Sequence, residues 1–280
     1  MPANNVRAMQ KATTLSADAI IVDLEDSVAP NAKEQARDAA VKAISANDYG
    51  YRLRVLRVNA LDTTWFELDM AAVGDAKPDA VLLPKVESVS TIKDAQARLD
   101  KLDSTGSIML WAMMETPKAV IQAASIAALK SECPRLTTFC IGNNDLARAA
   151  NMKVTFDRTL LLPWLMQLVV AAKAHDLTIL DGVYNDFVDL QGFALECNQG
   201  AAMGMSGKTL IHPKQIELAN AAFSPSDVEV IDAQLIVDTF ALAENSEVGV
   251  LQINGRMVER LHLEMARRTL DVAQRIKTQL

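Results

Sequence analysis

Residues 108–115 read IMLWAMME, a run of apolar side chains that ends on a carboxylate. The run is too short for a buried helix and too continuous for a strand with one face in water. It is typical of a parallel strand covered on both faces. Similar runs lie along most of the chain, at residues 18–24, 52–58, 80–85, 136–142, 177–183 and 201–211. The pattern therefore predicts seven parallel strands.

Longer segments of helical character separate these runs. Their apolar residues recur three and four positions apart, which indicates helices with one buried face. Strands and helices that alternate in this way predict a parallel α/β fold, either a (β/α)₈ TIM barrel or an open doubly wound sheet. The clearest of these segments are residues 31–45, 88–102, 117–129 and 160–175.

The N-terminus favours the barrel. Residues 4–15 are predicted to form a helix ahead of the first strand, whereas every helix of a (β/α)₈ barrel follows a strand. We interpret this as a barrel whose first strand is missing from this chain, which would bring the total to eight. The alternative is a helix that merely caps the N-terminal end.

The pattern changes near residue 223, so we predict two domains. Residues 1–222 form the TIM-barrel catalytic domain, and residues 223–280 form a C-terminal arm. Within the arm, the Ser-Pro-Ser sequence at 224–226 predicts the start of a helix that runs to about residue 244. A short strand at 248–253 and a long amphipathic helix at 258–279 follow. Such a segment could serve as a lid, as an oligomerisation arm, or as both.

Composition excludes several classes of protein. The 280 residues are 50% apolar and 22% charged, which is ordinary for a globular domain and excludes a disordered chain. Acidic residues outnumber basic ones by 35 to 28, and no basic tract alternates with aromatics, so nucleic acid is not the expected partner.

Targeting signals and cysteine usage favour a cytoplasmic protein. The longest apolar-rich run, residues 160–172, contains Pro163 and Gln167 and is shorter than the roughly 20 residues that cross a bilayer, so no membrane association is expected. The N-terminus has no secretory signal pattern. The three cysteines form no CxxC pair and are odd in number, which suits a reducing compartment.

Polar side chains end each predicted strand. In a parallel barrel the carboxyl ends of the strands converge on one rim, where barrel enzymes bind and convert their substrates. The convergence of polar groups from seven strands therefore predicts a functional site at that rim. The residues concerned are Asp23, Glu25, Asp26, Arg57, Asn59, Lys85, Glu87, Glu115, Asn143, Asn144, Asp145, Asp181, Ser206 and Lys208.

Glu115 and Asp145 are the best candidates for metal ligands. They end neighbouring strands and have no Cys or His near them in the sequence. Two carboxylates that are completed by water and substrate oxygens suit Mg²⁺, whereas no sequence pattern for zinc is present. The alternative is a pair of salt bridges from Glu115 and Asp145 to Arg57 and Lys85.

Six stretches, in order over nearly the whole chain, carry a family resemblance. They are DAIIVDLEDSVAPNAKEQAR (18–37), RVN (57–59), LLPKVES (82–88), METP (114–117), IGNNDLA (141–147) and MGMSGKTLIHPKQI (203–216). Together they resemble the HpcH/HpaI aldolase and citrate lyase β-subunit superfamily, and within it the CoA-ester lyases that act on malyl-CoA, β-methylmalyl-CoA and citramalyl-CoA.

The resemblance implies roles for the rim residues. It makes Glu115 and Asp145 the Mg²⁺ ligands and Arg57 the group that binds the carboxylate of an α-keto acid. It also implies that substrate contacts come from Lys85, Glu115, Gly142 and Asn143, and that Glu25 and Asp26 of the LED motif support the site.

The resemblance further implies a catalytic carboxylate on the arm of a neighbouring subunit, in a homo-oligomer such as a trimer or hexamer. Family members carry an aspartate in a GxMID-like motif. The corresponding stretch here is GRMVE, so that Glu259 replaces the aspartate. Glutamate keeps the carboxylate but is one methylene longer, and a small misplacement of a catalytic group is costly.

The expected function is Mg²⁺-dependent cleavage or formation of a carbon–carbon bond in a 3-hydroxyacyl-CoA. The partners would be acetyl- or propionyl-CoA and an α-keto acid, glyoxylate or pyruvate. One alternative is a malyl-CoA thioesterase, and another is a citrate lyase β subunit that acts on an acyl-carrier-protein thioester. A third is a catalytically inactive scaffold, which the substitution at Glu259 leaves open.

Overall fold

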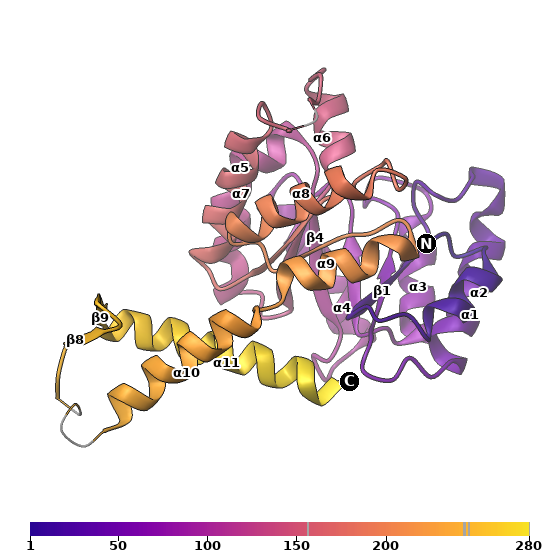
Figure 1. Ribbon diagram of the computed structural model, residues 1–280. Helices are drawn as coiled ribbons and strands as arrows, with labels where there is room; N and C mark the ends of the chain where they lie inside the picture. Colours follow the sequence, from indigo (N-terminus) through magenta and orange to yellow (C-terminus); the bar gives the residue numbers. More distant parts are fainter. Residues whose placement is uncertain (156, 243–244, 246, 280) are drawn as a thin grey trace. The chain divides into compact units, whose positions relative to one another are not determined.

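The computed structural model describes residues 1–155, 157–242, 245 and 247–279 (Figure 1). The chain divides into two compact units, Met1–Ala219 and Asn220–Leu280.

The first unit is built on one sheet of seven strands in sequence order, and every neighbouring pair is parallel. The sheet curls into a partial barrel, which confirms the predicted parallel α/β fold of the TIM-barrel type. The strands are β1 (Ala19–Asp23), β2 (Leu53–Arg57), β3 (Ala80–Leu83), β4 (Met109–Met114), β5 (Leu136–Ile141), β6 (Thr178–Asp181) and β7 (Gly207–Lys208).

Burial explains why the strands read as continuous apolar runs. All four residues of β3 and five of the six in β4 are buried. Successive side chains of a strand alternate between the two faces of the sheet. One face carries a cluster made of Val55, Ala80, Leu82, Trp111, Met113 and Cys140. Arg57 lies two residues beyond Val55, so its side chain continues this same face at the carboxyl end of β2.

Helices surround the sheet (Figure 1). Several start where local side chains satisfy free backbone N–H groups. Ser88 accepts a hydrogen bond from the N–H of Thr91, and Thr116 accepts one from Ala119 with Pro117 in the first helical position. The helices are α1 (Val6–Ala12), α2 (Lys33–Ala46), α3 (Phe66–Ala76), α4 (Val89–Leu102), α5 (Pro117–Ala128), α6 (Asn143–Ala149), α7 (Leu162–Lys173), α8 (Leu190–Ala202) and α9 (Ile216–Phe223).

The prediction for residues 201–211 was wrong in extent. Only Gly207 and Lys208 form a strand, whereas Ala201 and Ala202 complete α8. The chain then turns at Gly204, whose φ of +90° is readily available only to glycine. An apolar run that joins a helix end to a two-residue strand looks the same in sequence as one longer strand.

The edge of β1 that does not face β2 is paired with the first residues of the chain. Pro2 forms a parallel bridge with Asp23, the N–H of Asp23 donates to the Met1 carbonyl at 2.9 Å, and the N–H of Ala3 donates to the Asp23 carbonyl at 3.0 Å. The expected eighth strand remains a prediction.

The second unit contains α10 (Asp227–Ala241), β8 (Val250–Ile253), β9 (Arg256–Glu259) and α11 (Arg260–Gln279). β8 and β9 are antiparallel, joined by Asn254 and Gly255 with φ values of 52° and 75°. Positive φ at both positions is the requirement of a tight type I′ hairpin turn. The predicted helix at 258–279 therefore starts two residues later than expected, because Val258 and Glu259 belong to β9. The predicted end of the preceding helix, at 243–244, falls outside the described residues.

A small core holds the second unit together. Its buried members are Ala233, Ile236, Phe240, Ile253, Val258, Leu263 and Ala266. They come from both helices and both strands, so the hairpin and the helix pair form one packed unit. None of the helices in the described part of the chain is long and apolar enough to span a membrane.

Candidate active site

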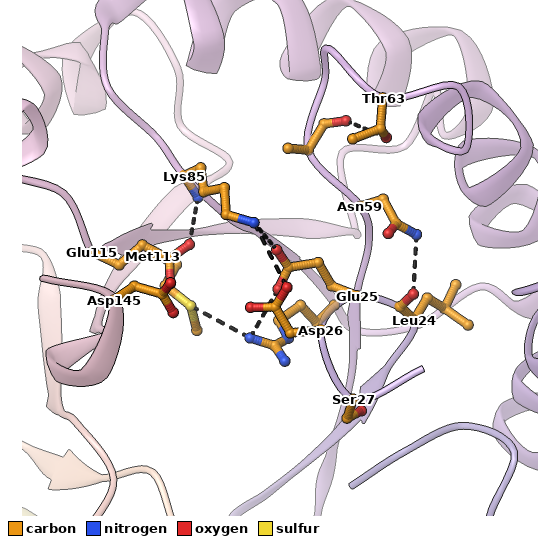
Figure 2. Close-up of polar contacts among 12 residues, drawn as sticks. Leu24, Glu25, Asp26, Ser27, Asn59, Thr63, Lys85, Met113, Glu115 and Asp145 are labelled. Carbon is orange, nitrogen blue, oxygen red and sulfur yellow. Dashed lines mark hydrogen bonds and ion pairs between the residues drawn. The ribbon is translucent and has the colours of Figure 1, made fainter. Parts of the chain in front are cut away.

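Glu115 and Asp145 come from neighbouring strand ends, as predicted. Glu115 follows β4 directly and is 1% exposed, while Asp145 lies in the first turn of α6. The two carboxylates are close enough that the charge of Asp145 raises the pKa of Glu115. Figure 2 shows both on the same side of Lys85. The structure thus brings the two predicted metal ligands together.

Lys85 connects this carboxylate pair to the loop after β1. Its backbone N–H donates to Glu115 Oε1 at 2.7 Å, and its ammonium lies 2.6 Å from Glu25 Oε1 and 3.7 Å from Asp26 Oδ1 (Figure 2). The backbone of Lys85 has a φ of +50°, which is uncommon for a residue other than glycine. This conformation lets one residue contact both groups of carboxylates.

Arg57 is held firmly by two carboxylates. Its Nε and Nη2 donate to the two oxygens of Asp23 at 2.6 and 2.5 Å, and its Nη1 lies 3.2 Å from Glu25 Oε2. Nη1 also points to Met113 Sδ at 3.8 Å. One edge of the guanidinium is therefore already paired within the protein, and Nη1 lies on the side of Glu25 and Met113.

The alternative of salt bridges from Glu115 and Asp145 to the two cations is not supported. Among the described residues, the side chains of Arg57 and Lys85 pair with Asp23, Glu25 and Asp26 instead. Asp145 pairs with Arg148 at 2.5 Å on its own helix.

Gly142 and Asn143 complete this side of the site. A Cβ atom at Gly142 would lie 2.5 Å from Cβ and 2.7 Å from Oε2 of Glu115, so only glycine leaves room for that carboxylate. Asn143 donates from Nδ2 to the Val183 carbonyl at 2.8 Å. Its Oδ1 is buried and, within the described part of the chain, has no hydrogen-bond partner.

The electrostatics of Glu115 indicate a missing positive charge. Burial raises the pKa of Glu115 to about 8, and the charges of Glu25 and Asp145 act in the same direction. The N–H of Lys85 and the charge of Arg57 oppose this rise but do not cancel it. In contrast, burial tends to raise the pKa of Asp23, but the hydrogen bonds and charge of Arg57 outweigh it and lower that pKa to about 2.

The residues present fit a hard divalent cation. Five carboxylates lie in this region against four cations. Glu25 Oε2 is buried and has an ion pair with Arg57 but no hydrogen bond among the described residues, and the buried Asn143 Oδ1 has neither. No group of three or more His, Cys, Asp or Glu side chains suited to a metal occurs in the part of the chain that the structure describes. A pair of carboxylates is what Mg²⁺ uses when water and substrate oxygens complete its shell.

A cavity of about 250 Å³ adjoins the site. Glu25, Asp26 and Lys85 form one part of its wall, so the cavity opens beside the charged groups just described. The rest of the lining comes from the segments that follow β1 and β2, namely Val28, Pro30, Lys33, Asn59, Ala60, Thr63 and Trp65.

Two predicted rim residues have a different role. Lys208 and Asp181 are fully buried and paired at 2.9 Å, and Glu196 and Arg158 complete the cluster. Sequence reasoning missed Arg158, which lies in the loop before α7 far from any strand end. It also missed Lys33, although a cation in the first turn of a helix opposes the helix dipole and could have been noticed.

Glu259 is the last residue of β9 in the second unit, and its N–H donates to Nδ1 of His262 at 2.9 Å. Its catalytic role remains a prediction.

Comparison with known proteins agrees with this geometry. Residues 1–213 match the HpcH/HpaI aldolase/citrate lyase family, and the chain belongs to that family. It is thus an enzyme of the HpcH/HpaI type that is related to proteins acting on CoA esters.

Individual relatives refine the comparison. A (3S)-malyl-CoA thioesterase of Cereibacter sphaeroides is 44% identical over 99% of this chain and 93% of its own length. An L-malyl-CoA/beta-methylmalyl-CoA lyase of the same organism is 29% identical over 95% of this chain and 90% of its own length. The crystal structure of CitE from Mycobacterium tuberculosis with magnesium, acetoacetate and coenzyme A has a TM-score of 0.77 at 27% identity, covering 98% of this chain and 96% of that one. These similarities support the thioesterase alternative better than the lyase that the sequence analysis put first.

Proposed function

We propose that this chain hydrolyses the thioester of (3S)-malyl-CoA or of a closely related 3-hydroxyacyl-CoA. Water adds to the thioester carbonyl carbon, the carbon–sulfur bond breaks, and malate and CoA leave. The main support for hydrolysis is the 44% identity over almost the whole chain to a protein of that activity. The support for the site is the Glu115–Asp145 pair, which lies near a fixed guanidinium.

In this proposal Glu115 and Asp145 hold Mg²⁺, and Arg57 binds the free carboxylate of the substrate. Mg²⁺ in this position supplies Lewis-acid chemistry toward a substrate oxygen. Lys85 fixes Glu115 through its N–H, and Gly142 leaves the space that Glu115 needs. Asn143 offers its buried, unpaired Oδ1 as an acceptor for a substrate hydroxyl or a bound water.

Glu25 and Asp26 support these groups. The Glu25 carboxylate lies between the Arg57 guanidinium and the Lys85 ammonium, and Asp26 adds a second negative charge near Lys85. Both cations are thus held where an anionic substrate can meet them.

We further propose that Glu259 moves a proton during the reaction, from the C-terminal arm of a neighbouring copy in a homo-oligomer. The exposed apolar side chains of α10 and α11 suit such an assembly, among them Val228, Ile231, Leu261 and Met265. Mixing inactive Glu115→Gln and Glu259→Gln chains should then restore part of the activity. A mixture of associated chains that stays inactive would contradict action between subunits.

The second candidate is carbon–carbon cleavage of malyl-CoA to glyoxylate and acetyl-CoA. The similarity to malyl-CoA lyases at 29% identity favours it, as does the suitability of a guanidinium for an α-keto acid carboxylate. The same residues would serve both reactions, so the products must decide.

The deciding experiment is product analysis with purified protein, (3S)-malyl-CoA and Mg²⁺. Hydrolysis gives malate and free CoA in equal amounts, whereas cleavage gives glyoxylate, trapped as its phenylhydrazone, and acetyl-CoA. The Glu115→Gln chain controls for contaminating enzymes. Acetyl-CoA without malate would overturn the hydrolase proposal. Activity of the purified chain on the CoA ester would also argue against a subunit that requires an acyl carrier protein.

A further inference from the structure

Lys33 is a buried cation with three hydrogen-bond partners. It is the first residue of α2 and is 5% exposed. Its ammonium donates to the carbonyls of Leu24 and Glu25 at 2.6 and 2.8 Å, and to Asn59 Oδ1 at 2.7 Å. An ammonium has three N–H donors, so each has an acceptor. Burial of a lysine is costly without such partners, and here they lie on the loops that follow β1 and β2.

These contacts fix the backbone that carries Glu25. Strand β1 ends at Asp23, so the carbonyls of Leu24 and Glu25 lie beyond the ladder of the sheet. Lys33 binds both of them. The Glu25 side chain then reaches Arg57 Nη1 at 3.2 Å and Lys85 Nζ at 2.6 Å. The position of one stretch of backbone therefore determines where two cations of the site lie.

The same network extends to the next strand. Asn59 donates from its N–H and Nδ2 to Asp69 Oδ2 at 2.8 and 2.6 Å, and Arg37 donates to Asp69 Oδ1 at 3.2 Å. Lys33 and Arg37 are one turn apart on α2, and Asp69 lies on α3. Loops from two strands are thus fixed against two helices by polar groups of which Lys33, Asn59 and Asp69 are buried.

We propose that Lys33 is a positioning residue for the active site, acting through the Leu24–Glu25 backbone on the Glu25 carboxylate and, through it, on Arg57 and Lys85. Its effect on turnover rests on the proposed function, but its effect on the loop does not. Removal of the ammonium leaves other donors on both carbonyls, since Asn59 Nδ2 also binds Leu24 O and the N–H of Val28 binds Glu25 O. Loss of Lys33 should therefore loosen the loop without unfolding the domain.

The test compares Lys33→Met with Arg135→Met. Arg135 is also a buried cation bound to backbone carbonyls, those of Asp103 and Ile108, but it precedes β5 at the opposite end of the sheet. Amide hydrogen exchange is measured over residues 24–28, together with kcat and KM on (3S)-malyl-CoA and the melting temperature. For Lys33→Met we expect at least tenfold faster exchange over 24–28 and a loss in kcat/KM of about 10- to 100-fold, the range seen for outer-shell partners of active-site ligands. Arg135→Met should lower the melting temperature, whereas amide exchange over 24–28 and kcat/KM should stay near those of the parent chain.

A second variant, Lys33→Ala, tests the proposal even if Lys33→Met does not fold. Lys33 lines the 250 Å³ cavity, so Lys33→Ala opens a space that an added alkylammonium such as propylammonium can enter. Partial recovery of protection over 24–28 and of kcat/KM with propylammonium supports the proposal. Unchanged exchange over 24–28 in both Lys33 variants would overturn it. If the parent chain itself does not act on malyl-CoA, the proposed function fails, whereas the exchange measurement still decides the role of Lys33.

Discussion

Strand β2 carries two arginines, Arg54 and Arg57, that form the same kind of ion pair at opposite ends of the sheet. Arg54 donates from Nε and Nη2 to Asp79 at 2.9 and 2.8 Å, and Arg57 donates from the same two nitrogens to Asp23 at 2.6 and 2.5 Å. Both pairs are bidentate, which is the strongest geometry between a guanidinium and a carboxylate. The difference lies in what surrounds each pair.

At the amino ends of the strands the carboxylates have hydrogen-bond donors. Asp79 also accepts from the backbone N–H of Arg54, and nearby Arg135 is paired with Asp100 and Asp103. Hydrogen bonds from Thr105, Ile108 and Arg135 hold the pKa of Asp103 well below its usual range. These contacts have the features of stabilising interactions, because Asp79, Asp100 and Asp103 all accept hydrogen bonds.

At the carboxyl ends some buried acceptors lack a hydrogen-bond donor. The pKa of Glu115 is raised to about 8, and buried oxygens of Glu25 and Asn143 have no hydrogen-bond partner among the described residues. Unsatisfied buried polar atoms are rare in folded proteins and call for an explanation, such as a bound ion or ligand. A high density of charges occurs at both ends, so it is the unmatched acceptors that distinguish the site.

The sharpest test of this contrast is Glu115→Gln, with Asp79→Asn as the matched change at the amino end. Glutamine keeps the shape of Glu115 but removes the charge that would bind Mg²⁺. We expect a loss of about 10³-fold in kcat/KM, since metal ions contribute several kcal/mol to such barriers. Asp79→Asn should leave kcat/KM within about twofold. Steady-state kinetics with saturating Mg²⁺ measures both.

The melting temperature tests the Glu115→Gln chain independently of its activity. Because the folded protein favours the protonated form of Glu115, glutamine should not destabilise the metal-free fold at neutral pH. We expect Mg²⁺ to raise the melting temperature of the parent chain but not that of Glu115→Gln. A Glu115→Gln chain that keeps both its activity and this Mg²⁺-induced rise would refute the proposed metal site.

A smaller effect is expected from exchanging each arginine of β2 for lysine. Lysine cannot reproduce the fork that pairs with Asp23 while leaving Nη1 toward the site, so Arg57→Lys should lower kcat/KM by about 100-fold, mainly through KM. Arg54→Lys changes the same geometry far from the site and should affect only thermal stability. Equal kinetic effects of the two substitutions would show that the ends of β2 do not differ in the way proposed.

The parallel sheet and most of the polar residues of the site could be predicted from the sequence alone. Strands such as β4 are buried on both faces, so their apolar runs stand out, and the residue after each run is placed at the carboxyl end by the parallel arrangement alone. That is why Glu115, Arg57 and Lys85 could be predicted to lie together.

Other features depend on contacts between distant residues and leave little trace in sequence. Asp23 was predicted at the rim, but its bidentate contact with Arg57 depends on the register of β1 against β2. Lys208 ends a strand as the rim residues do, yet it is buried in an ion cluster because Arg158, Asp181 and Glu196 meet there. The last two residues of β9, Val258 and Glu259, were assigned to the following helix, because a four-residue strand is too short to show a period.

The finest distinction, within the carboxyl end itself, is how its carboxylates respond to pH. Mg²⁺ can bind Glu115 only after its proton leaves, and burial raises the pKa of this group to about 8 in the metal-free protein. Apparent Mg²⁺ affinity should therefore be highest above about pH 8 and fall by up to tenfold for each pH unit below it, while one proton is displaced per ion. Asp23 contributes no change over this range, because its pKa of about 2 keeps it ionised throughout.

Calorimetric titration of the metal-free protein with Mg²⁺ in buffers of different ionisation enthalpy measures both the affinity and the protons released. The Glu115→Gln chain serves as the control and should release no proton. An affinity that stays constant between about pH 6 and 8 would mean that Glu115 is already ionised without metal, and the imbalance of charge at this end of the sheet would then be far smaller than proposed.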